Sequence, residues 1–307
     1  MKKLLGILTT FFFFGSIALA KDPPKKYLDD NYVFKHHEFI KWPEKTGVWG
    51  KMETHGWISQ NAWNLKYEKT IVRDGKYSLR FEMRDGDCHK GECGRKNKAG
   101  RSEVSLVGSF PKNAKGHVGK VWYAWSLYIP KTTDHINPAY TLLGQFKMPN
   151  DYVKQLNRID SSGFDENCPE IPVSFHLDEE GLILVKDGVL KCGVHEKKIV
   201  IPYKEIHNKW HDFLMNVEWT DEEDGYIELW VNDKKVYQSK GKTIGKLIKR
   251  KKDKLKMGPM FRFGIYNGNR NEVDNVKTQV VYYDSFKSGK NCKKTTLFHN
   301  CKKLPNN

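Results

Sequence analysis

The chain has 307 residues and a net charge of +16, with 53 lysines and arginines against 37 aspartates and glutamates. Beyond the N-terminus, no stretch approaches the roughly 18 apolar residues of a membrane-spanning helix, which excludes a transmembrane segment in the mature chain. Such a basic charge suits a polyanion, but the N-terminus indicates export, so nucleic acid is not expected as the natural partner. The charge favours an acidic polysaccharide, an anionic envelope or simple solubility.

The N-terminus has the features of an export signal. Lys2 and Lys3 precede a mostly apolar stretch from Leu4 to Ile17, and Ala18-Leu19-Ala20 forms a small-x-small cleavage site. We therefore expect residues 1–20 to be a signal peptide and the mature protein to be periplasmic or secreted.

Strand-like runs follow one another along the mature chain, and helical periodicity is scarce. The predicted strands are Tyr77–Arg84, Arg101–Val107, Val121–Pro130, Thr141–Met148, Ile171–Leu177, Leu182–Lys186, Lys197–Pro202, His211–Thr220, Tyr226–Val231, Lys235–Gln238, Phe261–Asn269 and Gln279–Lys287. Neither a repeat nor a linker divides them. This all-β pattern predicts one β-sandwich domain of jelly-roll type over residues 21–290, with a polar tail over 291–307.

Two polar segments interrupt the strands. Asn150–Pro169 is long and irregular, which is typical of a functional loop. Lys246–Lys256 is strongly basic and is interpreted as a solvated loop.

Six cysteines lie in the mature chain, and an even number in an oxidising compartment predicts disulfides. Proximity in the sequence favours the pairs Cys88–Cys93, Cys168–Cys192 and Cys292–Cys301. Their spacing does not match a zinc site.

The segment Phe261–Asn269, FRFGIYNGN, carries the strongest functional pattern. With a period of two, Phe261 and its alternate neighbours face a core, while Arg262, Gly264 and Tyr266 face the other way. A cation and a phenol flanking a glycine are expected to form the floor of a site for a flat, anionic ligand such as a sugar acid.

Three other strands show the same alternation. Their polar faces carry Arg101, Glu103 and Ser105; Gln145 and Lys147; and Ser174 and His176. In a sandwich these faces can line one concave sheet and form a groove.

This set of side chains suits β-elimination from a uronic acid. Arg, Gln or protonated Lys can neutralise the C5 carboxylate, and His or Tyr can move the proton. A glycoside hydrolase would instead need paired carboxylates, which the strands do not offer. The GxSxG motif of serine hydrolases is also absent from the sequence.

The chain resembles the heparin lyase I family and the wider group of jelly-roll polysaccharide lyases that includes glucuronan and alginate lyases. The resemblance runs from Tyr77 to Lys287 through YSLRFEMR, GRSEVS, WYAWSLYIP, GQFKMP, WHDFLMNVEWT and FRFGIY. FRFGIY is similar to the family's Phe-Lys-Phe-Gly-x-Tyr strand. The resemblance implies a concanavalin A-like sandwich and the cleavage of an anionic polysaccharide.

By position, the resemblance makes Tyr266 the catalytic tyrosine and Arg262 the counterpart of the family's lysine. Arg101 and Gln145 would bind and neutralise the carboxylate, and Glu103 would orient Arg101. The expected substrate-binding residues are Arg262, Glu103 and Asn267, which is next to Tyr266.

One position departs from the family. Where the family has Gln-x-His, this chain has Gln145-Phe146-Lys147, so the histidine proposed as base is replaced. Lys147 could act with a lowered pKa, His176 could substitute, or Tyr266 could carry both proton transfers. We favour the last, with His176 as an auxiliary.

The sequence therefore predicts an exported polysaccharide lyase, with a non-catalytic, lectin-like binding protein on the same scaffold as the alternative. No cofactor is required for this chemistry, and the resemblance leaves a Ca²⁺ site open. The sequence does not define the oligomeric state.

Overall fold

The computed structural model describes most of the chain after the N-terminus. The residues described are 22–34, 39–40, 52–54, 61–88, 99–106, 114–136, 140–150, 152, 170–187, 195–249, 251, 254–268, 273, 276–296 and 298–304. The expected signal peptide lies outside them, as does nearly all of the predicted loop Asn150–Pro169.

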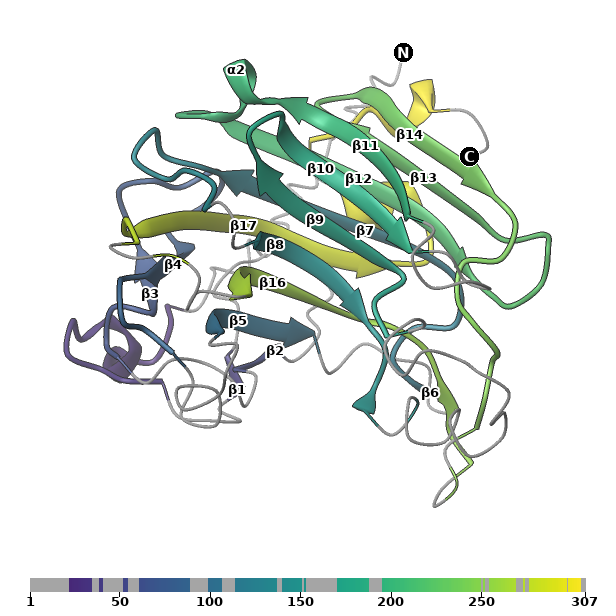
Figure 1. The fold of residues 1–307 in the computed structure, drawn as a ribbon, viewed down its shortest axis with the longest axis horizontal. Helices are drawn as coiled ribbons and strands as arrows, with labels where there is room; N and C mark the ends of the chain where they lie inside the picture. The colour runs from purple at the N-terminus through teal and green to yellow at the C-terminus, as the bar shows by residue number, and fades with distance from the viewer. Residues whose placement is uncertain are drawn as a thin grey trace, which may run out of the picture.

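Two large antiparallel sheets lie face to face (Figure 1). The first, here called the groove sheet, has the order β1 (Phe39–Ile40), β2 (Met52–Thr54), β5 (Gly100–Leu106), β16 (Met260–Gly268), β8 (Tyr140–Lys147), β9 (Val173–Asp178), β10 (Gly181–Asp187) and β11 (His195–Pro202).

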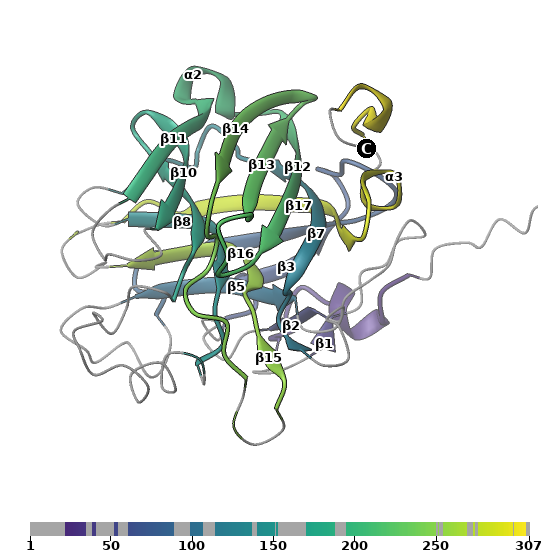
Figure 2. The same cartoon turned by 90° about the vertical axis from the view of Figure 1, so that its right-hand side faces the viewer.

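The second, here called the back sheet, has the order β14 (Lys234–Lys240), β13 (Tyr226–Val231), β12 (Trp210–Trp219), β7 (Gly119–Tyr128), β17 (Gln279–Gly289), β4 (Ser78–Met83) and β3 (Leu65–Glu68). A short parallel pair, β6 (Ala114–Lys115; Figure 1) and β15 (Lys256–Met257; Figure 2), lies beyond one end of the sandwich. The helices among the described residues are single turns: η1 (Lys25–Leu28), α2 (Tyr203–Ile206), α3 (Cys292–Thr295) and η3 (Cys301–Lys303).

The single-domain jelly-roll prediction is confirmed, and every predicted strand is present with small shifts at its ends. The sequence analysis missed the short strands β1, β2, β3, β6 and β15, whose few residues give too little alternation to be recognised.

An aromatic core joins the two sheets. The Phe261 ring of β16 lies 4.6 Å from that of Phe146 and 5.0 Å from that of Trp125, measured between centroids. Phe263 lies 4.9 Å from Tyr283 of the back sheet. Burying such rings stabilises the sandwich by roughly 1.5–3 kcal/mol for each side chain, so β16 is fixed from below and its other face is left for a site.

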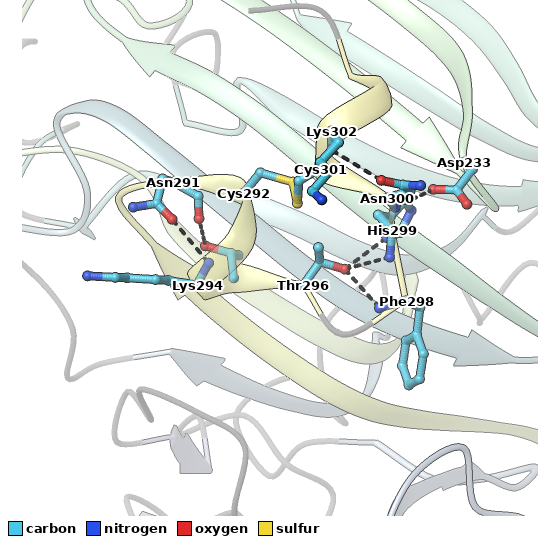
Figure 3. The surroundings of a disulfide bond; sticks show 11 residues. Asp233, Asn291, Cys292, Lys294, Thr296, Phe298, His299, Asn300, Cys301 and Lys302 are labelled. Carbon is cyan, nitrogen blue, oxygen red and sulfur yellow. Dashed lines mark hydrogen bonds between the residues drawn. A yellow bond between two sulfur atoms is a disulfide. The ribbon is translucent and has the colours of Figure 1, made fainter. Parts of the chain in front are cut away.

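The C-terminal tail packs on the outer face of the back sheet (Figure 2). Cys292 and Cys301 form a disulfide with Cα atoms 5.8 Å apart, which confirms that predicted pair (Figure 3). Both cysteines are buried in one cluster with Trp122 and Trp230, whose rings stack at 5.9 Å.

The other predicted disulfides are only partly within the described residues. Cys88 is disulfide-bonded, but Cys93, Cys168 and Cys192 lie outside the described residues. None of the described helices is long and apolar enough to cross a membrane.

Candidate active site

Four adjacent strands bring the predicted polar faces together. The order β5-β16-β8-β9 places Arg101, Arg262, Gln145 and Ser174 on neighbouring strands of the groove sheet. Arg262 lies opposite Ser105 on one side and opposite Gln145 on the other, and Gln145 lies opposite Ser174. The predicted groove therefore exists in the structure, with an accessible volume of about 580 Å³.

The lining combines the predicted polar side chains with residues that the sequence analysis did not select. It comprises Arg101, Tyr140, Leu142, Gln145, Lys147, Glu170, Ile171, Ser174, His176, Asp178, Ile183, Val185, Lys197 and Tyr266.

Tyr266 lies on the groove face of β16, directly opposite Arg101 on β5. The guanidinium carbon of Arg101 is 3.9 Å from the centre of the Tyr266 ring, which is a cation–π contact. A phenol and a cation are thus within the span of one sugar, as catalysis at C5 would require.

Glu103 holds this cationic end of the groove from below. Its carboxylate accepts a hydrogen bond of 2.7 Å from Gln145 Nε2 and lies 3.7 Å from Arg101 Nη1. Glu103 is 2 % exposed and is not among the residues that line the groove. It therefore lies in place to orient Arg101 and Gln145, as the family resemblance implies for Arg101, and not to contact a ligand in the groove.

Arg262 also lies beneath the groove, with 2 % of its surface exposed. Burial lowers the pKa of its guanidinium to about 10, with partial opposition from Glu103. Its Nε has no hydrogen-bond partner among the described residues. Arg262 was expected to bind substrate, but it is not among the residues that line the groove. It contributes positive potential from below.

Lys147 and Glu170 form an ion pair in the groove. Burial and the nearby Arg262 lower the pKa of the Lys147 ammonium to about 8, while Glu170 opposes the change. An ammonium held by a carboxylate is arranged to donate hydrogen bonds, and this favours neutralisation of a substrate charge over proton abstraction.

His176 lies two strands away from Tyr266, with Leu142 between them in the register. Its Nε2 is 2.9 Å from Ser174 Oγ. The Tyr140 ring lies between the two, 6.3 Å from the His176 ring and 5.7 Å from the Tyr266 ring. His176 is therefore in the groove, as predicted, and is separated from Tyr266 by Tyr140.

The position of Asn267 corrects the sequence analysis. Asn267 is fully buried and faces away from Tyr266, since neighbouring residues of a strand point to opposite sides. Its Oδ1 accepts from Thr141 Oγ1 at 2.9 Å, and its Nδ2 donates to Gln279 Oε1 at 2.7 Å. Both ends of the amide are used inside the protein, so Asn267 is structural.

Gly264 also differs from its expected role. It has φ of +130°, and a Cβ there would lie 2.1 Å from the Ser102 carbonyl oxygen and 2.8 Å from the Phe81 ring. The glycine permits the close approach of β16 to β5 and to the back sheet, and it does not form the floor of the groove.

The part of the chain that the structure describes contains no cluster of three or more His, Cys, Asp or Glu side chains able to hold a metal ion. The Ca²⁺ site that the family resemblance left open stays a prediction.

The sandwich and its groove define a class of protein: a jelly roll with a cleft on one sheet, lined by cationic, acidic, aromatic and apolar side chains. Within that class the chain belongs to the polysaccharide lyase family, whose sequence profile matches residues 43–287. It is a polysaccharide lyase. No curated protein matches the sequence.

Solved structures resemble the fold at low sequence identity. The endo-β-1,4-glucuronan lyase of the fungus Trichoderma reesei is 14% identical, with a TM-score of 0.53 over 85% of this chain and 96% of that one. An alginate lyase from Pseudomonas aeruginosa is 13% identical, with a TM-score of 0.47 over 73% and 85% of the two chains. An alginate lyase from a Chlorella virus is 16% identical, with a TM-score of 0.43 over 74% and 90%.

Proposed function

We propose that this lyase cleaves an anionic, uronate-containing polysaccharide by β-elimination, with Tyr266 as both base and acid. One observation carries the proposal: the Arg101 guanidinium lies 3.9 Å from the centre of the Tyr266 ring, beside the Gln145 amide that Glu103 orients. A carboxylate bound by Arg101 and Gln145 would place C5 of the same sugar next to the phenol.

The reaction first requires that the substrate carboxylate be neutralised; only then can a base remove the C5 proton. A uronate carboxylate makes the proton on C5 less acidic, and cations or N–H donors that neutralise it reverse this effect. Arg101, Gln145 and the Lys147 ammonium supply these donors in the groove, and the buried Arg262 adds positive potential beneath them.

Tyr266 then moves one proton. Its phenolate takes the proton from C5, the C4–O4 bond breaks, a C4–C5 double bond forms, and the phenol returns the proton to O4 of the leaving chain. Atoms and charge balance without a redox partner. Arg101 stacked on the ring stabilises the phenolate, because a nearby opposite charge favours the ionised form.

The finer substrate assignment rests on sequence resemblance. FRFGIY and the matching runs from Tyr77 to Lys287 are similar to the heparin lyase I family. The surface charge of the chain suits a highly charged polymer, and heparin, glucuronan and alginate all offer the required carboxylate.

We also propose that the protein is exported, to the periplasm or beyond, with residues 1–20 removed and the domain spanning 21–290. The charged and apolar N-terminal pattern and the Cys292–Cys301 disulfide support this, since disulfides persist in oxidising compartments. Intact mass of the protein recovered from a native host tests it: a mass that retains the first twenty residues would contradict the proposal.

The activity is tested by the ultraviolet absorbance of unsaturated uronates. Purified mature protein is incubated with heparin, glucuronan, alginate and polygalacturonate, with the Tyr266→Phe variant in parallel. We expect absorbance to rise on at least one polymer and to fall by about 10²–10⁴-fold in the variant, the usual contribution of a general acid or base. No rise on any polymer, with retention on an acidic-glycan column, would instead indicate a lectin-like binding protein.

A further inference from the structure

Tyr140 lies at the start of β8 and reaches across to the proposed catalytic residue. Its hydroxyl oxygen is 3.2 Å from the Tyr266 hydroxyl oxygen. The two rings meet edge to face, with centroids 5.7 Å apart. This hydroxyl pair lies in the groove, because both side chains line it.

A missing side chain makes room for this contact. Gly268 is paired with Tyr140 across the β16–β8 ladder. A Cβ on Gly268 would lie 2.1 Å from Tyr140 Cζ and 2.3 Å from its hydroxyl oxygen. The Tyr140 ring therefore occupies the space above Gly268, and any larger residue there would displace it.

The space above Gly268 helps to set the orientation of the Tyr140 ring, because burial alone does not hold this side chain in place. The residue is 39 % exposed, and an exposed tyrosine is ordinarily free to turn into solvent. Here the ring is bounded by Tyr266 on one side and by His176, at 6.3 Å, on the other. The geometry thus holds the hydroxyl toward Tyr266.

The charged and titratable groups around Tyr266 come from each neighbouring strand. Arg101 approaches from β5, Tyr140 from β8 and His176 from β9 behind Tyr140. Asp178 and Lys197 line the same groove. The Tyr140 hydroxyl is within hydrogen-bond distance of the Tyr266 hydroxyl.

We propose that Tyr140 is a positioning residue of the reaction, which donates a hydrogen bond to the Tyr266 oxygen and stabilises the phenolate that takes the C5 proton. The proposal rests on the proposed function of Tyr266. When Tyr266 is ionised, its oxygen can only accept, so Tyr140 must be the donor. When Tyr266 has taken the proton, its O–H is free to turn to O4 of the leaving sugar.

A hydrogen bond donated to a charged group stabilises the charged form, so the Tyr140 hydroxyl should stabilise the Tyr266 phenolate. Removing the Tyr140 hydroxyl should therefore move the rising limb of the pH profile to higher pH, with the reaction itself unchanged.

The test compares kcat/KM against pH for the full-length mature protein and three variants. Tyr140→Phe removes the hydroxyl and keeps the ring, and Gly268→Ala displaces the ring and keeps the hydroxyl. Tyr226→Phe is the matched control, since Tyr226 is half-buried in the back sheet and donates one long hydrogen bond of 3.4 Å to Asn216.

We expect Tyr140→Phe to shift the rising limb upward by about one pH unit, which is about a tenfold loss near neutral pH that recovers at alkaline pH. Gly268→Ala should shift it in the same direction, and Tyr226→Phe should leave it in place. A loss in Tyr140→Phe that is equal at all pH values would show a merely structural role and overturn the proposal. If Gly268→Ala does not fold, Tyr140→Phe decides alone.

A second measurement, the absorbance titration of the Tyr266 phenol, does not depend on enzymatic activity. The phenolate absorbance of Tyr266 is obtained as the difference between a protein and its Tyr266→Phe derivative, measured with and without Tyr140→Phe. If the wild type cleaves none of the polymers yet this titration shifts, the proposed function fails and the hydroxyl pair stands. If the wild type is active and neither readout moves in Tyr140→Phe, the pair is overturned and the lyase function is unaffected.

Discussion

Arg101 and Tyr266 face each other across β5 and β16, and the guanidinium is stacked 3.9 Å from the ring centre. Glu103, two residues along β5 from Arg101, lies 3.7 Å from the guanidinium on its buried side. The stack thus joins the two requirements of β-elimination, because the same cation can bind the carboxylate and stabilise the phenolate.

The contribution of the planar Arg101 guanidinium to activity can be tested by replacing Arg101 with lysine. An ammonium keeps the charge but loses the stacked plane and the paired N–H donors that suit a carboxylate. We expect Arg101→Lys to lower kcat/KM by about 10²-fold, the order that misplacement of a reacting group produces. Initial rates of unsaturated-uronate formation measure this loss.

Arg84→Lys is the control for that substitution. The Arg84 guanidinium also stacks on an aromatic ring, at 4.1 Å from Trp63, but it lies outside the groove lining. Its replacement should leave kcat/KM unchanged. Equal losses in the two variants would contradict a specific role for the Arg101 stack.

The charge of the Lys147 ammonium should determine how kcat/KM changes as the pH rises above neutral. Its pKa is lowered to about 8 by burial and by Arg262, so it is charged below about pH 8 and increasingly neutral above. If its charge neutralises the substrate carboxylate, kcat/KM should fall as the pH rises through this value. Lys147→Arg keeps a charge over the whole range and should remove that falling limb.

The same measurement separates the alternatives for the base. A Lys147 that abstracted the C5 proton would have to be neutral, and kcat/KM would then rise through about pH 8 and be lost in Lys147→Arg. That result would contradict the assignment of both proton transfers to Tyr266.

Much of the groove could be predicted from alternation along single strands. Arg101 and Glu103, and Arg262 and Tyr266, share faces as a period of two requires, and the register between β5 and β16 is regular. The alternation could not reveal depth, so Glu103 and Arg262 were expected at the surface and are buried beneath it.

Tyr140 was missed because the strand that carries it is irregular. Counting back in twos from Gln145 predicts Leu143 on the groove face. A shift of register between Leu142 and Gly144 reverses the alternation, so that Leu142 and Tyr140 face the groove. A bulge of this kind depends on pairing with neighbouring strands, and no local pattern in the sequence indicates it.

Gly264 is the position in β16 where a substitution should be most harmful to stability. Its φ of +130° is essentially restricted to glycine, and a Cβ would lie 2.1 Å from the Ser102 oxygen. We expect Gly264→Ala to lower the free energy of unfolding by about 3 kcal/mol or more, because conformational strain and backbone overlap add. Denaturant unfolding measures it.

Gly86→Ala separates those two causes. Gly86 also has a positive φ, of +76°, but a Cβ there meets nothing within 4 Å. Strain alone should cost about 1 kcal/mol. A loss in Gly264→Ala no greater than in Gly86→Ala would show that the close approach of β5 adds nothing.

The Cys292–Cys301 disulfide should stabilise the protein without influencing catalysis. It closes a short loop with a sequence separation of 9 on the outer face of the back sheet. Loss of such a crosslink is expected to cost about 3 kcal/mol of unfolding free energy through the entropy of the unfolded chain. A Cys292→Ser and Cys301→Ser double variant, compared with wild type in denaturant, tests this.

Tryptophan fluorescence should show where the double variant loses stability, because the tail packs against the stacked Trp122 and Trp230. We expect these tryptophans to become exposed at lower denaturant concentration in the double variant, while kcat/KM at 25 °C stays at the wild-type value. Reduced activity in the folded double variant would show instead that the tail influences the groove through the sandwich, against the separation of the two faces described here.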